Sequence, residues 1–343
     1  MQVAVTGATG FIGSEIVKAL LDRGHNVHGT VRDPDNAGKV DPLSALSGAA
    51  DRLTLFKADL LDSKSFDAAF EDCDVVMHVA SPYVVDVEDA QRDLVDPALK
   101  GTKSALVAAN ASDVKRVVLT SSAAAITDEP EDRVYTEADW NEKSTLHRNP
   151  YYYSKMLAER AAWRFVEEDD PTFDLVVINP TGVIGPSIGS GLSTTSQIIA
   201  DLLNGGVYPA IIDITFPYVD VRDVAEAHVR AAENPEASGR YICSNELVSL
   251  ERTVDVLNGN GFDTYKLPKI TLTSSFGSLL VKQLARFQPP GSRSFIETNL
   301  GRTLTLDTSK IQRELGMEFR DIDTSIIETA NDLLRWGHVE IRS

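Results

Sequence analysis

The chain has 343 residues, enough for one large domain or two modest ones, and 43% of them are hydrophobic, which argues for a globular core. Its formal net charge of −18, from 33 basic and 51 acidic residues, argues against nucleic acid or an anionic membrane as a partner. No apolar run reaches the roughly 18 residues of a membrane helix. Met1 leads almost at once into an apolar segment that leaves no room for a signal peptide, so we expect a cytoplasmic protein.

Short apolar segments rich in β-branched residues alternate with longer amphipathic segments through the first 180 residues. Such segments are typical of strands buried on both faces, and the alternation predicts an α/β fold with a doubly wound parallel sheet, the Rossmann arrangement. The strands are expected at 3–6, 27–31, 53–57, 75–79, 117–120 and 175–179. The helices between them are expected near 12–23, 63–71, 88–110 and 153–168.

Three glycines follow the first expected strand and open the first helix, in the segment Thr6-Gly-Ala-Thr-Gly-Phe-Ile-Gly13. Such glycines allow a tight turn, a close approach of the backbone to a pyrophosphate, and close packing of helix on strand. Free N–H groups at the helix N-terminus attract the anion. The segment therefore predicts a dinucleotide site that involves Gly7, Thr9, Gly10, Phe11, Ile12 and Gly13.

The end of the second strand indicates which dinucleotide binds. Proteins that bind NAD usually place an acid there for the ribose hydroxyls, whereas this chain has Val31, which cannot accept those hydrogen bonds. Arg32 follows directly and Lys39 lies in the next loop, and both cations suit a 2′-phosphate. The sequence predicts NADP(H), although Asp33 or Asp35 offers an alternative partner for a ribose.

Residues at the ends of later strands are also placed to meet the cofactor, because ligands of such sheets bind at the carboxyl edge. The expected contacts are Asp59 and Leu60 for the adenine, Val79, Ala80 and Ser81 for the pyrophosphate and ribose, and Thr120 and Ser121 further along the edge. Helix capping by Asp59 or Ser81 is the alternative.

The run Tyr151-Tyr-Tyr-Ser-Lys155 contains one tyrosine, Tyr151, with a lysine four residues later. On a helix these two side chains share one face. A phenol normally holds its proton until about pH 10, and a neighbouring cation makes it a better acid. The pair suits donation of a proton to a carbonyl oxygen as hydride reaches the carbon. Taken alone, the pair is better explained by a surface helix with two amphipathic side chains, and the motifs around it favour the catalytic interpretation.

The pattern of elements changes after the sixth strand. Residues 180–217 are rich in Gly, Pro, Ser and Thr and predict a loop across a ligand site. We expect an NADP-binding domain from residues 1–180 and 218–245. A smaller, discontinuous α+β substrate-binding domain is expected from 181–217 and 246–343, with the ligand in the cleft between the two.

Several motifs occur in an order that resembles one enzyme family. They are the N-terminal glycine segment, Val31-Arg-Asp-Pro34, His78-Val-Ala-Ser-Pro82, Thr120-Ser-Ser122, Tyr151-x-x-x-Lys155 and Pro180-Thr-Gly-Val-Ile-Gly-Pro186. Together they resemble the extended short-chain dehydrogenase/reductases, in the branch of dihydroflavonol 4-reductases, cinnamoyl-CoA reductases and microbial carbonyl or aldehyde reductases. The similarity covers nearly the whole chain.

The resemblance implies roles for the matching residues. Tyr151 would be the general acid, and Lys155 would lower its pKa and hold the nicotinamide ribose. Ser122 rather than Ser121 would bind the carbonyl, because the family's serine directly precedes a small residue, here Ala123. The nicotinamide would be lined by Pro180, Thr181 and Val183, and the 2′-phosphate would be held by Arg32 and Lys39.

Two departures from the family pattern concern the substrate. Plant dihydroflavonol reductases have an asparagine where this chain has Thr127, and cinnamoyl-CoA reductases have a cysteine-containing stretch where this chain has residues 149–153. We therefore expect an NADPH-dependent reductase of aromatic or otherwise apolar aldehydes and ketones. Candidate pocket residues, for each of which ordinary packing is the alternative, are Tyr83, Thr127, Tyr152, Ser193, Ser196, Phe216 and Tyr218, with Ser196 also expected to reach the cofactor.

Other functions of the same fold stay open. A nucleotide-sugar epimerase or dehydratase would keep NAD tightly bound, with Arg222 or Arg293 on the sugar diphosphate. A hydroxysteroid dehydrogenase would differ mainly in substrate, and a non-catalytic NADP sensor would typically lack the Tyr/Lys pair. Cys73 and Cys243 are expected as buried thiols, and no Cys/His spacing suits zinc. We expect no metal, a small-molecule carbonyl substrate, and a monomer or homodimer.

Overall fold

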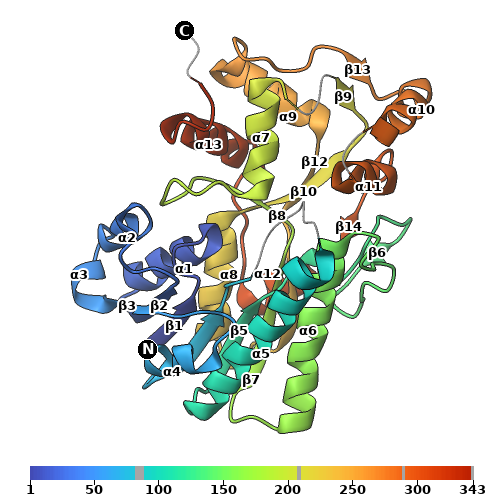
Figure 1. Cartoon of the computed structure of the whole chain (residues 1–343). Coiled ribbons are helices and arrows are strands. Elements are labelled where there is room, and N and C mark those ends of the chain that lie inside the picture. The colour runs from blue at the N-terminus through green and yellow to red at the C-terminus, as the bar shows by residue number, and fades with distance from the viewer. Residues whose placement is uncertain (82–88, 207–209, 288–289, 341–343) are drawn as a thin grey trace.

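A parallel sheet covered by helices on both faces forms the larger part of the molecule, and a smaller mixed part lies across the carboxyl edge of that sheet (Figure 1). The computed structural model describes residues 1–81, 89–206, 210–287 and 290–340, the side chains of 290–292 excepted. The predicted division into two domains at particular residues stays a prediction.

Within the described residues, seven parallel strands make up the main sheet, in the order β11-β7-β5-β4-β1-β2-β3. From β1 the chain adds β2 and β3 on one side of the sheet, and then β4 and the later strands on the other side. Ligands of doubly wound sheets bind at such a switch point, here between β1 and β4. The predicted fold class is confirmed. The strands are β1 (Gln2–Thr6), β2 (Asn26–Val31), β3 (Leu53–Lys57), β4 (Val75–His78), β5 (Arg116–Thr120), β7 (Asp174–Pro180) and β11 (Gly239–Cys243).

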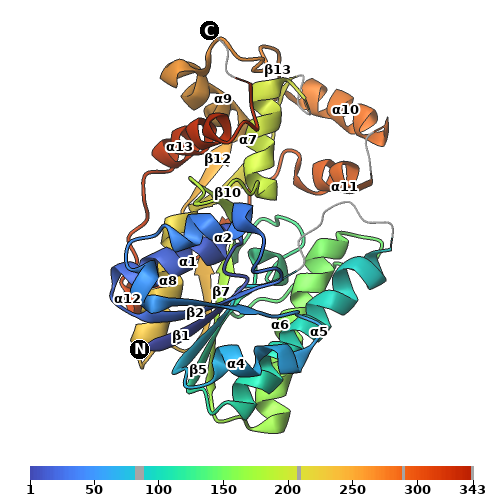
Figure 2. The same ribbon diagram turned by 60° about the vertical axis from the view of Figure 1, so that its left-hand side comes forward.

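Helices cover both faces of this sheet (Figure 2). One face is covered by α1 (Phe11–Asp22) and α8 (Val221–Glu233), with α12 (Ser309–Leu315) beside them. The other is covered by α4 (Asp67–Phe70), α5 (Asp96–Ala111) and α6 (Pro150–Asp169). The shorter helices are α2 (Ala37–Ser44), α3 (Ala49–Arg52), η1 (Ser63–Phe66), η2 (Gln91–Val95) and η3 (Ala123–Ala125).

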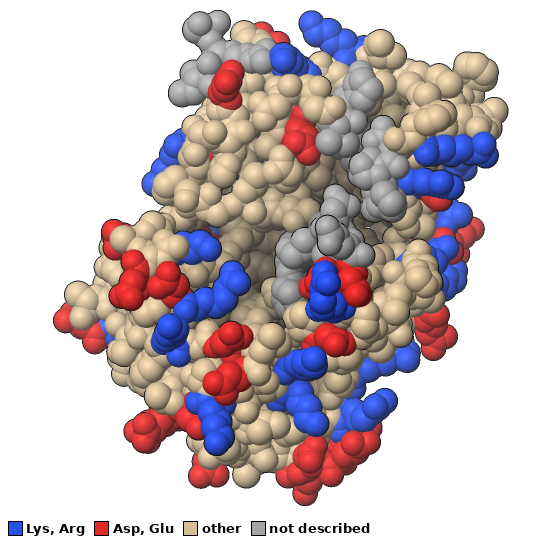
Figure 3. All heavy atoms as spheres, in the orientation of Figure 1, with Lys and Arg blue, Asp and Glu red and all other residues tan. Residues whose placement is uncertain are grey.

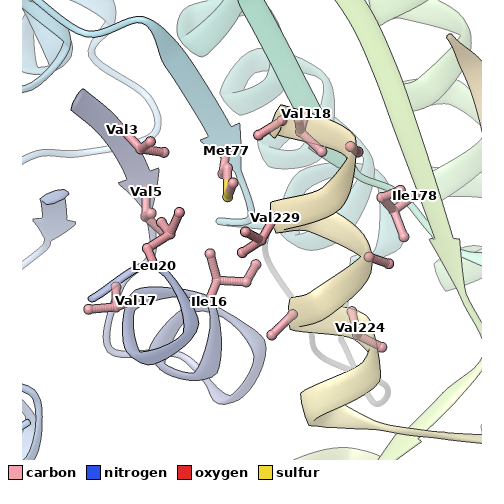
Figure 4. Packing of buried hydrophobic residues seen from close by; sticks show 14 of the residues in the cluster. Val3, Val5, Ile16, Val17, Leu20, Met77, Val118, Ile178, Val224 and Val229 are labelled. Atoms are coloured by element: carbon pink, nitrogen blue, oxygen red, sulfur yellow. The ribbon is translucent and has the colours of Figure 1, made fainter. Parts of the chain in front are cut away.

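The layer between α1, α8 and the sheet is apolar and fully buried. Ile16 of α1 and Val229 of α8 point toward Met77 of β4, with Val5 of β1 beside them (Figure 4). Burial of each such side chain contributes roughly 1.5–3 kcal/mol by removal from water. This packing fixes the end of β1 and the start of α1, where the glycine segment lies.

The smaller part has its own apolar core, which includes Ile199, Leu257 and Ile326, all 0% exposed. A mixed sheet of order β12-β10-β8 runs through it. Its main elements are β8 (Gly182–Ile184), α7 (Thr194–Asn204), β10 (Thr215–Asp220), β12 (Glu246–Ser249), α9 (Leu250–Leu257) and α13 (Ile322–Arg335). The remaining elements are β6 (Val134–Tyr135), β9 (Ile211–Ile212), η4 (Asn258–Phe262), β13 (Thr271–Leu272), α10 (Ser275–Leu284), η5 (Ala285–Phe287), α11 (Pro290–Asn299) and β14 (Thr305–Leu306).

Three expectations about elements were wrong. The segment 180–217 is not a single loop, because it contains β8, α7, β9 and the start of β10. Ser193 starts α7 by accepting a hydrogen bond from the Ser196 N–H at 3.0 Å. The helix expected from residue 153 begins at Pro150, since proline is well suited to the first position of a helix. The expected helix at 63–71 is divided into η1 and α4.

Both cysteines are buried and free, as predicted. Burial raises the pKa of the Cys73 thiol to about 12, so it behaves as an inert apolar group. Across the described residues, no helix combines the length and the apolar character needed to cross a membrane. Nor does any cluster of three or more His, Cys, Asp or Glu in that part of the chain suit a metal ion.

Candidate active site

The glycine segment between β1 and α1 is tightly folded, and its geometry requires glycine. Gly7 has a φ of +67°, which favours glycine, and a Cβ there would lie 3.1 Å from the Cα of Ala80. A Cβ on Gly10 would lie 3.1 Å from the Gly7 carbonyl oxygen, and one on Gly13 would overlap that oxygen. The backbone is therefore left uncovered where a pyrophosphate is predicted.

The N-terminus of α1 is open to an anion. Gly10 supplies no side-chain hydrogen bond to the first turn, and that turn contains no acidic residue. Its N–H groups and the positive end of the helix dipole therefore suit a negative ligand. Thr9, Phe11 and Ile12 are partly buried beside this cradle, which fits the pyrophosphate of a dinucleotide.

Thr6 joins the glycine segment to the end of β4, a role that the sequence reasoning missed. Its Oγ1 accepts hydrogen bonds from the N–H groups of Val79 and Ala80, each at 3.0 Å. The same Oγ1 lies 2.9 Å from His78 Nδ1 and donates its proton there, so the neutral ring is protonated at Nε2. Burial, together with the smaller effect of the Lys155 cation, lowers the pKa of His78 to about 4. The predicted contacts Val79 and Ala80 are thus held beside the glycine segment.

The two cations predicted for a 2′-phosphate follow the end of β2. Arg32 and Lys39 are exposed, and neither forms an ion pair with another described residue. Asp33 accepts a hydrogen bond from the Asp35 N–H at 3.1 Å within its own turn. Val31, at the strand end, is buried. The arrangement leaves two positive side chains available where the sequence predicts an extra phosphate.

The residues predicted to meet the adenine are used locally. Asp59 Oδ1 accepts a hydrogen bond from the Leu61 N–H at 2.9 Å, which closes a turn after β3. Leu60 is partly buried and packs on the core beneath α5. The Asp59 carboxylate thus closes a turn rather than capping a helix, since Asp62 caps η1, and contact with an adenine stays a prediction.

Tyr151 and Lys155 lie in the first two turns of α6. Asn149, with a φ of +49°, turns the chain into this helix, and its Nδ2 donates to Asp128 Oδ1 at 2.7 Å. Lys155 Nζ lies 5.9 Å from the centre of the Tyr151 ring. The expected helical face is present, with the ammonium beside the phenol ring.

The Lys155 ammonium is buried at the carboxyl edge of the sheet. The residue is 8% exposed, and its Nζ donates to Ser81 Oγ at 3.1 Å. Burial lowers the pKa of this ammonium to about 8, while the Glu159 carboxylate opposes the shift. At neutral pH Lys155 is therefore mainly a cation, which favours the phenolate form of a neighbouring phenol.

Ser122 follows the end of β5 with an extended backbone, and its Oγ accepts a hydrogen bond from the Ala124 N–H at 3.1 Å. That bond uses a lone pair, so the hydroxyl can still donate to a ligand oxygen. Ser121 Oγ instead donates to Glu159 Oε2 at 2.5 Å, and Thr120 Oγ1 lies 2.7 Å from His228 Nε2. Because both side chains already have partners in the protein, Thr120 and Ser121 would contact a cofactor through their backbone. These contacts stay predictions.

Pro180, Thr181 and Val183 lie where β7 passes into β8. Pro180 is the last residue of β7, and Thr181 Oγ1 donates to Ser244 Oγ at 3.2 Å. Val183 is buried against the core of the larger part. These residues lie at the carboxyl edge of the sheet, and their contact with a nicotinamide stays a prediction.

The predicted pocket residues are not equally placed. Tyr83 lies outside the described residues. Tyr152 is partly buried, and its ring meets the Tyr151 ring edge-on at 6.1 Å. Phe216 and Tyr218 are buried and stacked, with ring centres 5.6 Å apart. The contacts of Phe216 and Tyr218 are those of ordinary packing, the alternative to a role in a substrate pocket.

Three hydroxyl residues predicted near the substrate form internal bonds. The buried Thr127 donates to the Glu129 carbonyl at 2.9 Å. Ser193 caps α7, and its Oγ donates to Ser196 Oγ at 2.8 Å. Ligand contacts for these residues stay predictions.

The surface is hollowed between the larger and smaller parts (Figure 3).

Residues 3–243 match the model of a known family, described as the NAD dependent epimerase/dehydratase family. The chain belongs to this family. It is 44% identical to cinnamoyl-CoA reductase CAD2 of Medicago truncatula over 266 residues, which cover 74% of this chain and 79% of the relative. It is 35% identical to tetraketide alpha-pyrone reductase 1 of Arabidopsis thaliana, covering 98% of this chain and 97% of the relative.

Among solved structures, yeast methylglyoxal/isovaleraldehyde reductase Gre2 complexed with NADPH is similar to the whole molecule. The alignment covers 99% of this chain and 100% of that protein, with a TM-score of 0.79 and 30% identity. These comparisons confirm the resemblance to reductases of the extended short-chain type. As a member of the epimerase/dehydratase family with reductases as its relatives, the chain is an oxidoreductase with a nicotinamide dinucleotide cofactor.

The sequence reasoning missed a buried polar group that adjoins the site of this family member. Glu159 lies four residues after Lys155, the same helical spacing that drew attention to Tyr151. It contacts Asn179, which ends a strand expected from the sequence, and Arg240, which lies in β11. Extending the helical face one turn further along α6 would have found the carboxylate. Its partners come from distant strands, so the sequence spacing alone gave no signal for them.

Proposed function

We propose that the protein reduces aldehydes or ketones with NADPH and that Tyr151 donates the proton to the carbonyl oxygen. The observation that carries this proposal is the position of the buried Lys155 ammonium. Its Nζ lies 5.9 Å from the centre of the Tyr151 ring and donates a hydrogen bond to Ser81. Ser81 follows β4, the strand next to the glycine segment at the switch point of the sheet. The proton donor and the cofactor cradle therefore share one edge of the sheet.

The side chains have distinct tasks in this reaction. Tyr151 gives its phenolic proton to the carbonyl oxygen, and the Lys155 cation stabilises the phenolate that remains. Ser122 donates a hydrogen bond to the same oxygen and so stabilises the charge that develops on it. The bound dinucleotide supplies the hydride. The smaller part of the protein excludes water and holds the substrate.

Two observations support NADPH over NADH. Arg32 and Lys39 are exposed, form no ion pair within the described part of the chain, and follow a strand that ends in a valine. Guanidinium and ammonium groups bind phosphate through charge-assisted hydrogen bonds. The solved structure of Gre2 contains NADPH.

The substrate class we propose is small or aromatic aldehydes and ketones. The name of the yeast neighbour includes methylglyoxal and isovaleraldehyde, both carbonyl compounds. The identity to a cinnamoyl-CoA reductase favours a second candidate, a CoA thioester, whose reduction would release the thiol of CoA. The net charge of −18 disfavours that polyanionic substrate, so we place it second.

An epimerase or dehydratase of nucleotide sugars is a weaker candidate. Arg222 pairs with Asp220 at 2.7 Å and also with Glu328, and Arg293 pairs with Glu297 at 2.8 Å. The two arginines considered for a sugar diphosphate are thus already neutralised by acids of the chain. Such an enzyme would also return its cofactor unchanged.

The experiment that tests the proposal is loss of reduced-nicotinamide absorbance with NADPH or NADH across aldehydes, ketones, diketones, flavanonols and cinnamoyl-CoA. We expect NADPH to be consumed with apolar aldehydes or ketones, without release of thiol. Thiol release with cinnamoyl-CoA at a higher kcat/KM would favour the second candidate. No consumption with any carbonyl compound would contradict both.

A further inference from the structure

We propose that Glu159 is a positioning residue of this active site. Its buried carboxylate holds α6 against three adjacent strands and so fixes Tyr151 and Lys155 relative to Ser122. The inference rests on the proposed function for those three residues. Glu159 itself touches neither the substrate nor the cofactor in this account, and acts through its partners.

The Glu159 carboxylate is fully buried and receives a hydrogen bond from each of three strands. Ser121, directly after β5, donates to Oε2 at 2.5 Å. Asn179 of β7 donates from Nδ2 to Oε2 at 2.7 Å, and Arg240 of β11 donates from Nε to Oε1 at 2.5 Å. Because β5, β7 and β11 are neighbours in the sheet, a single side chain of α6 fixes the helix on all three.

This carboxylate is connected to the proposed catalytic groups on both sides. Glu159 lies one helical turn after Lys155 and two after Tyr151, on the same face of α6. Asn179 Nδ2 also donates to the Ser122 carbonyl oxygen at 3.2 Å. A displacement of α6 would therefore alter the distance between the proton donor and the serine that binds the same oxygen.

The charge on Glu159 is costly to bury and is matched by one partner. Arg240 is 6% exposed, donates to the carbonyl oxygens of Glu137 and Asp139, and lies over the Trp140 ring at 4.0 Å. An apolar pair of similar volume would often stabilise a fold as well as a buried ion pair does. Directed hydrogen bonds to three strands add a fixed geometry that an apolar pair lacks.

Glu159 also acts on Lys155 through its charge. The groups that face Lys155 among the described residues are Tyr151 and Glu159 on α6, and His78 and Ser81 from the β4 side. His78 is neutral above about pH 4, so Glu159 is the anion in this set. Its removal disfavours the ammonium and moves the titration of Lys155 to lower pH.

The test compares Glu159→Gln with Trp163→Phe. Glutamine keeps the size and removes the charge of Glu159. Phenylalanine at position 163 removes the Trp163 Nε1 donor, 3.3 Å from Glu159 Oε1, and part of a ring that packs on the core, but it leaves the carboxylate charged and bonded to Ser121, Asn179 and Arg240. The titration of the Lys155 nitrogen is followed by ¹⁵N NMR in protein without cofactor, and its signal is assigned by its loss in Lys155→Arg. We expect Glu159→Gln to lower the midpoint by at least about one pH unit and Trp163→Phe to leave it in place.

Kinetics give the second readout. Reduction requires protonated Lys155, so kcat/KM is expected to fall as pH rises through about 8, and this fall occurs at lower pH in Glu159→Gln. If Glu159→Gln does not fold, Glu159→Asp keeps the charge but shortens the reach. Its kcat is expected to fall at least tenfold, on the order of 1.4 kcal/mol, with Lys155 titrating near its normal midpoint.

The outcomes separate this inference from the proposed function. An unchanged Lys155 midpoint in Glu159→Gln, or wild-type kcat in Glu159→Asp, overturns the positioning role while the reductase assignment stands. Loss of stability alone, with an unchanged pH profile, identifies a purely structural ion pair and also overturns it. If the wild-type protein reduces no carbonyl compound, the proposed function fails, and the NMR titration decides the inference by itself.

Discussion

At the residue scale, the site keeps cations in two very different environments. Lys155 is buried, and its pKa falls to about 8 because burial disfavours the ammonium. Arg32 and Lys39 are exposed, where their charges are solvated and screened by salt. The buried cation suits chemistry on a neighbouring phenol, and the exposed cations suit recognition of a phosphate.

Replacement of Arg32 tests the choice of cofactor. Arg32→Glu is expected to raise the KM for NADPH by roughly ten- to a hundredfold, because a hydrogen bond to a charged group is worth roughly 1.5–3 kcal/mol. The KM for NADH should change far less, since NADH has no 2′-phosphate. Steady-state kinetics with both cofactors measure the two values.

Arg164→Glu is the matched control, because it makes the same charge change at an exposed position of α6. We expect it to leave both KM values near those of the wild-type protein. Equal increases for NADPH and NADH in Arg32→Glu would contradict the assignment.

Sequence spacing predicted the residues whose role depends on local geometry. Tyr151 and Lys155 share a helical face, and the spacing of four residues was sufficient to pair them. The contact between Thr6 and His78 was not predicted, because it depends on the pairing of β1 with β4, 72 residues apart. For Phe216 and Tyr218, the sequence could not separate a pocket wall from a stacked core.

At the element scale, the site depends on where helices begin. The glycine segment brings the start of α1 to the end of β1, and Pro150 starts α6 one residue before Tyr151. Both starts leave N–H groups without partners in the helix and place side chains at the carboxyl edge of the sheet.

Substitution of Gly13 tests the packing of the first of these helices. In Gly13→Ala the added Cβ would overlap the Gly7 carbonyl oxygen, so the segment must move. We expect the free energy of unfolding to fall by about 1–3 kcal/mol, as measured by urea denaturation. NADPH affinity, measured by fluorescence titration, should also fall because the cradle is distorted.

Gly259→Ala is the control for this change, since no atom lies within 4 Å of a Cβ added there. It should bind NADPH as the wild-type protein does. Wild-type affinity and stability in Gly13→Ala would show that the close contact is not required.

The elements predicted with the best boundaries were the strands of the parallel sheet. The strand at 53–57 agrees with β3 at both ends, although β3 lies at the edge of the sheet and none of its residues is fully buried, because α3 ends directly before it. The helix α7 was missed because glycine, serine and threonine surround it, although Ser193 is a typical N-cap. The Gly, Pro, Ser and Thr content of the whole segment 180–217 thus concealed the helix start at Ser193.

At the scale of the whole molecule, two neutral histidines are sealed between sheet and helices. His78 is 2% exposed and His228 is 0% exposed, and burial lowers the pKa of each to about 4. His228 Nδ1 donates to the Val224 carbonyl at 2.7 Å and its Nε2 accepts from Thr120. Both rings therefore link the sheet to its surroundings in the neutral form.

These histidines predict a loss of stability in mild acid. Between about pH 6.5 and pH 4 the unfolded chain binds protons that the folded protein excludes, so the free energy of unfolding falls as pH falls. We expect a decrease of about 2 kcal/mol per histidine from pH 7 to pH 5. Glu15 and Asp223, whose pKa values are raised by burial, act in the opposite sense.

Urea denaturation at both pH values measures this decrease. His228→Gln removes one titrating group, so its pH dependence should be about half as steep. A free energy of unfolding that stays constant from pH 7 to pH 5 would contradict the neutral, buried state of these rings.

The parallel sheet could be predicted from the sequence because each strand carries its own apolar signal. The internal arrangement of the smaller part could not, since its core combines α7, α9 and α13, which lie far apart between residues 194 and 335. Its C-terminal region also returns to the larger part, where Ile311 and Leu315 of α12 join the first core. No local pattern indicates which core a short amphipathic helix will join.

The central claim, that Tyr151 is the proton donor of a carbonyl reductase, is tested most directly by NADPH oxidation in Tyr151→Phe. We expect kcat to fall by roughly 10²–10⁴-fold, the usual contribution of a general acid, with NADPH affinity nearly unchanged. Tyr153→Phe, which removes a hydroxyl two residues away on α6, should retain turnover. Wild-type turnover in Tyr151→Phe would contradict the account.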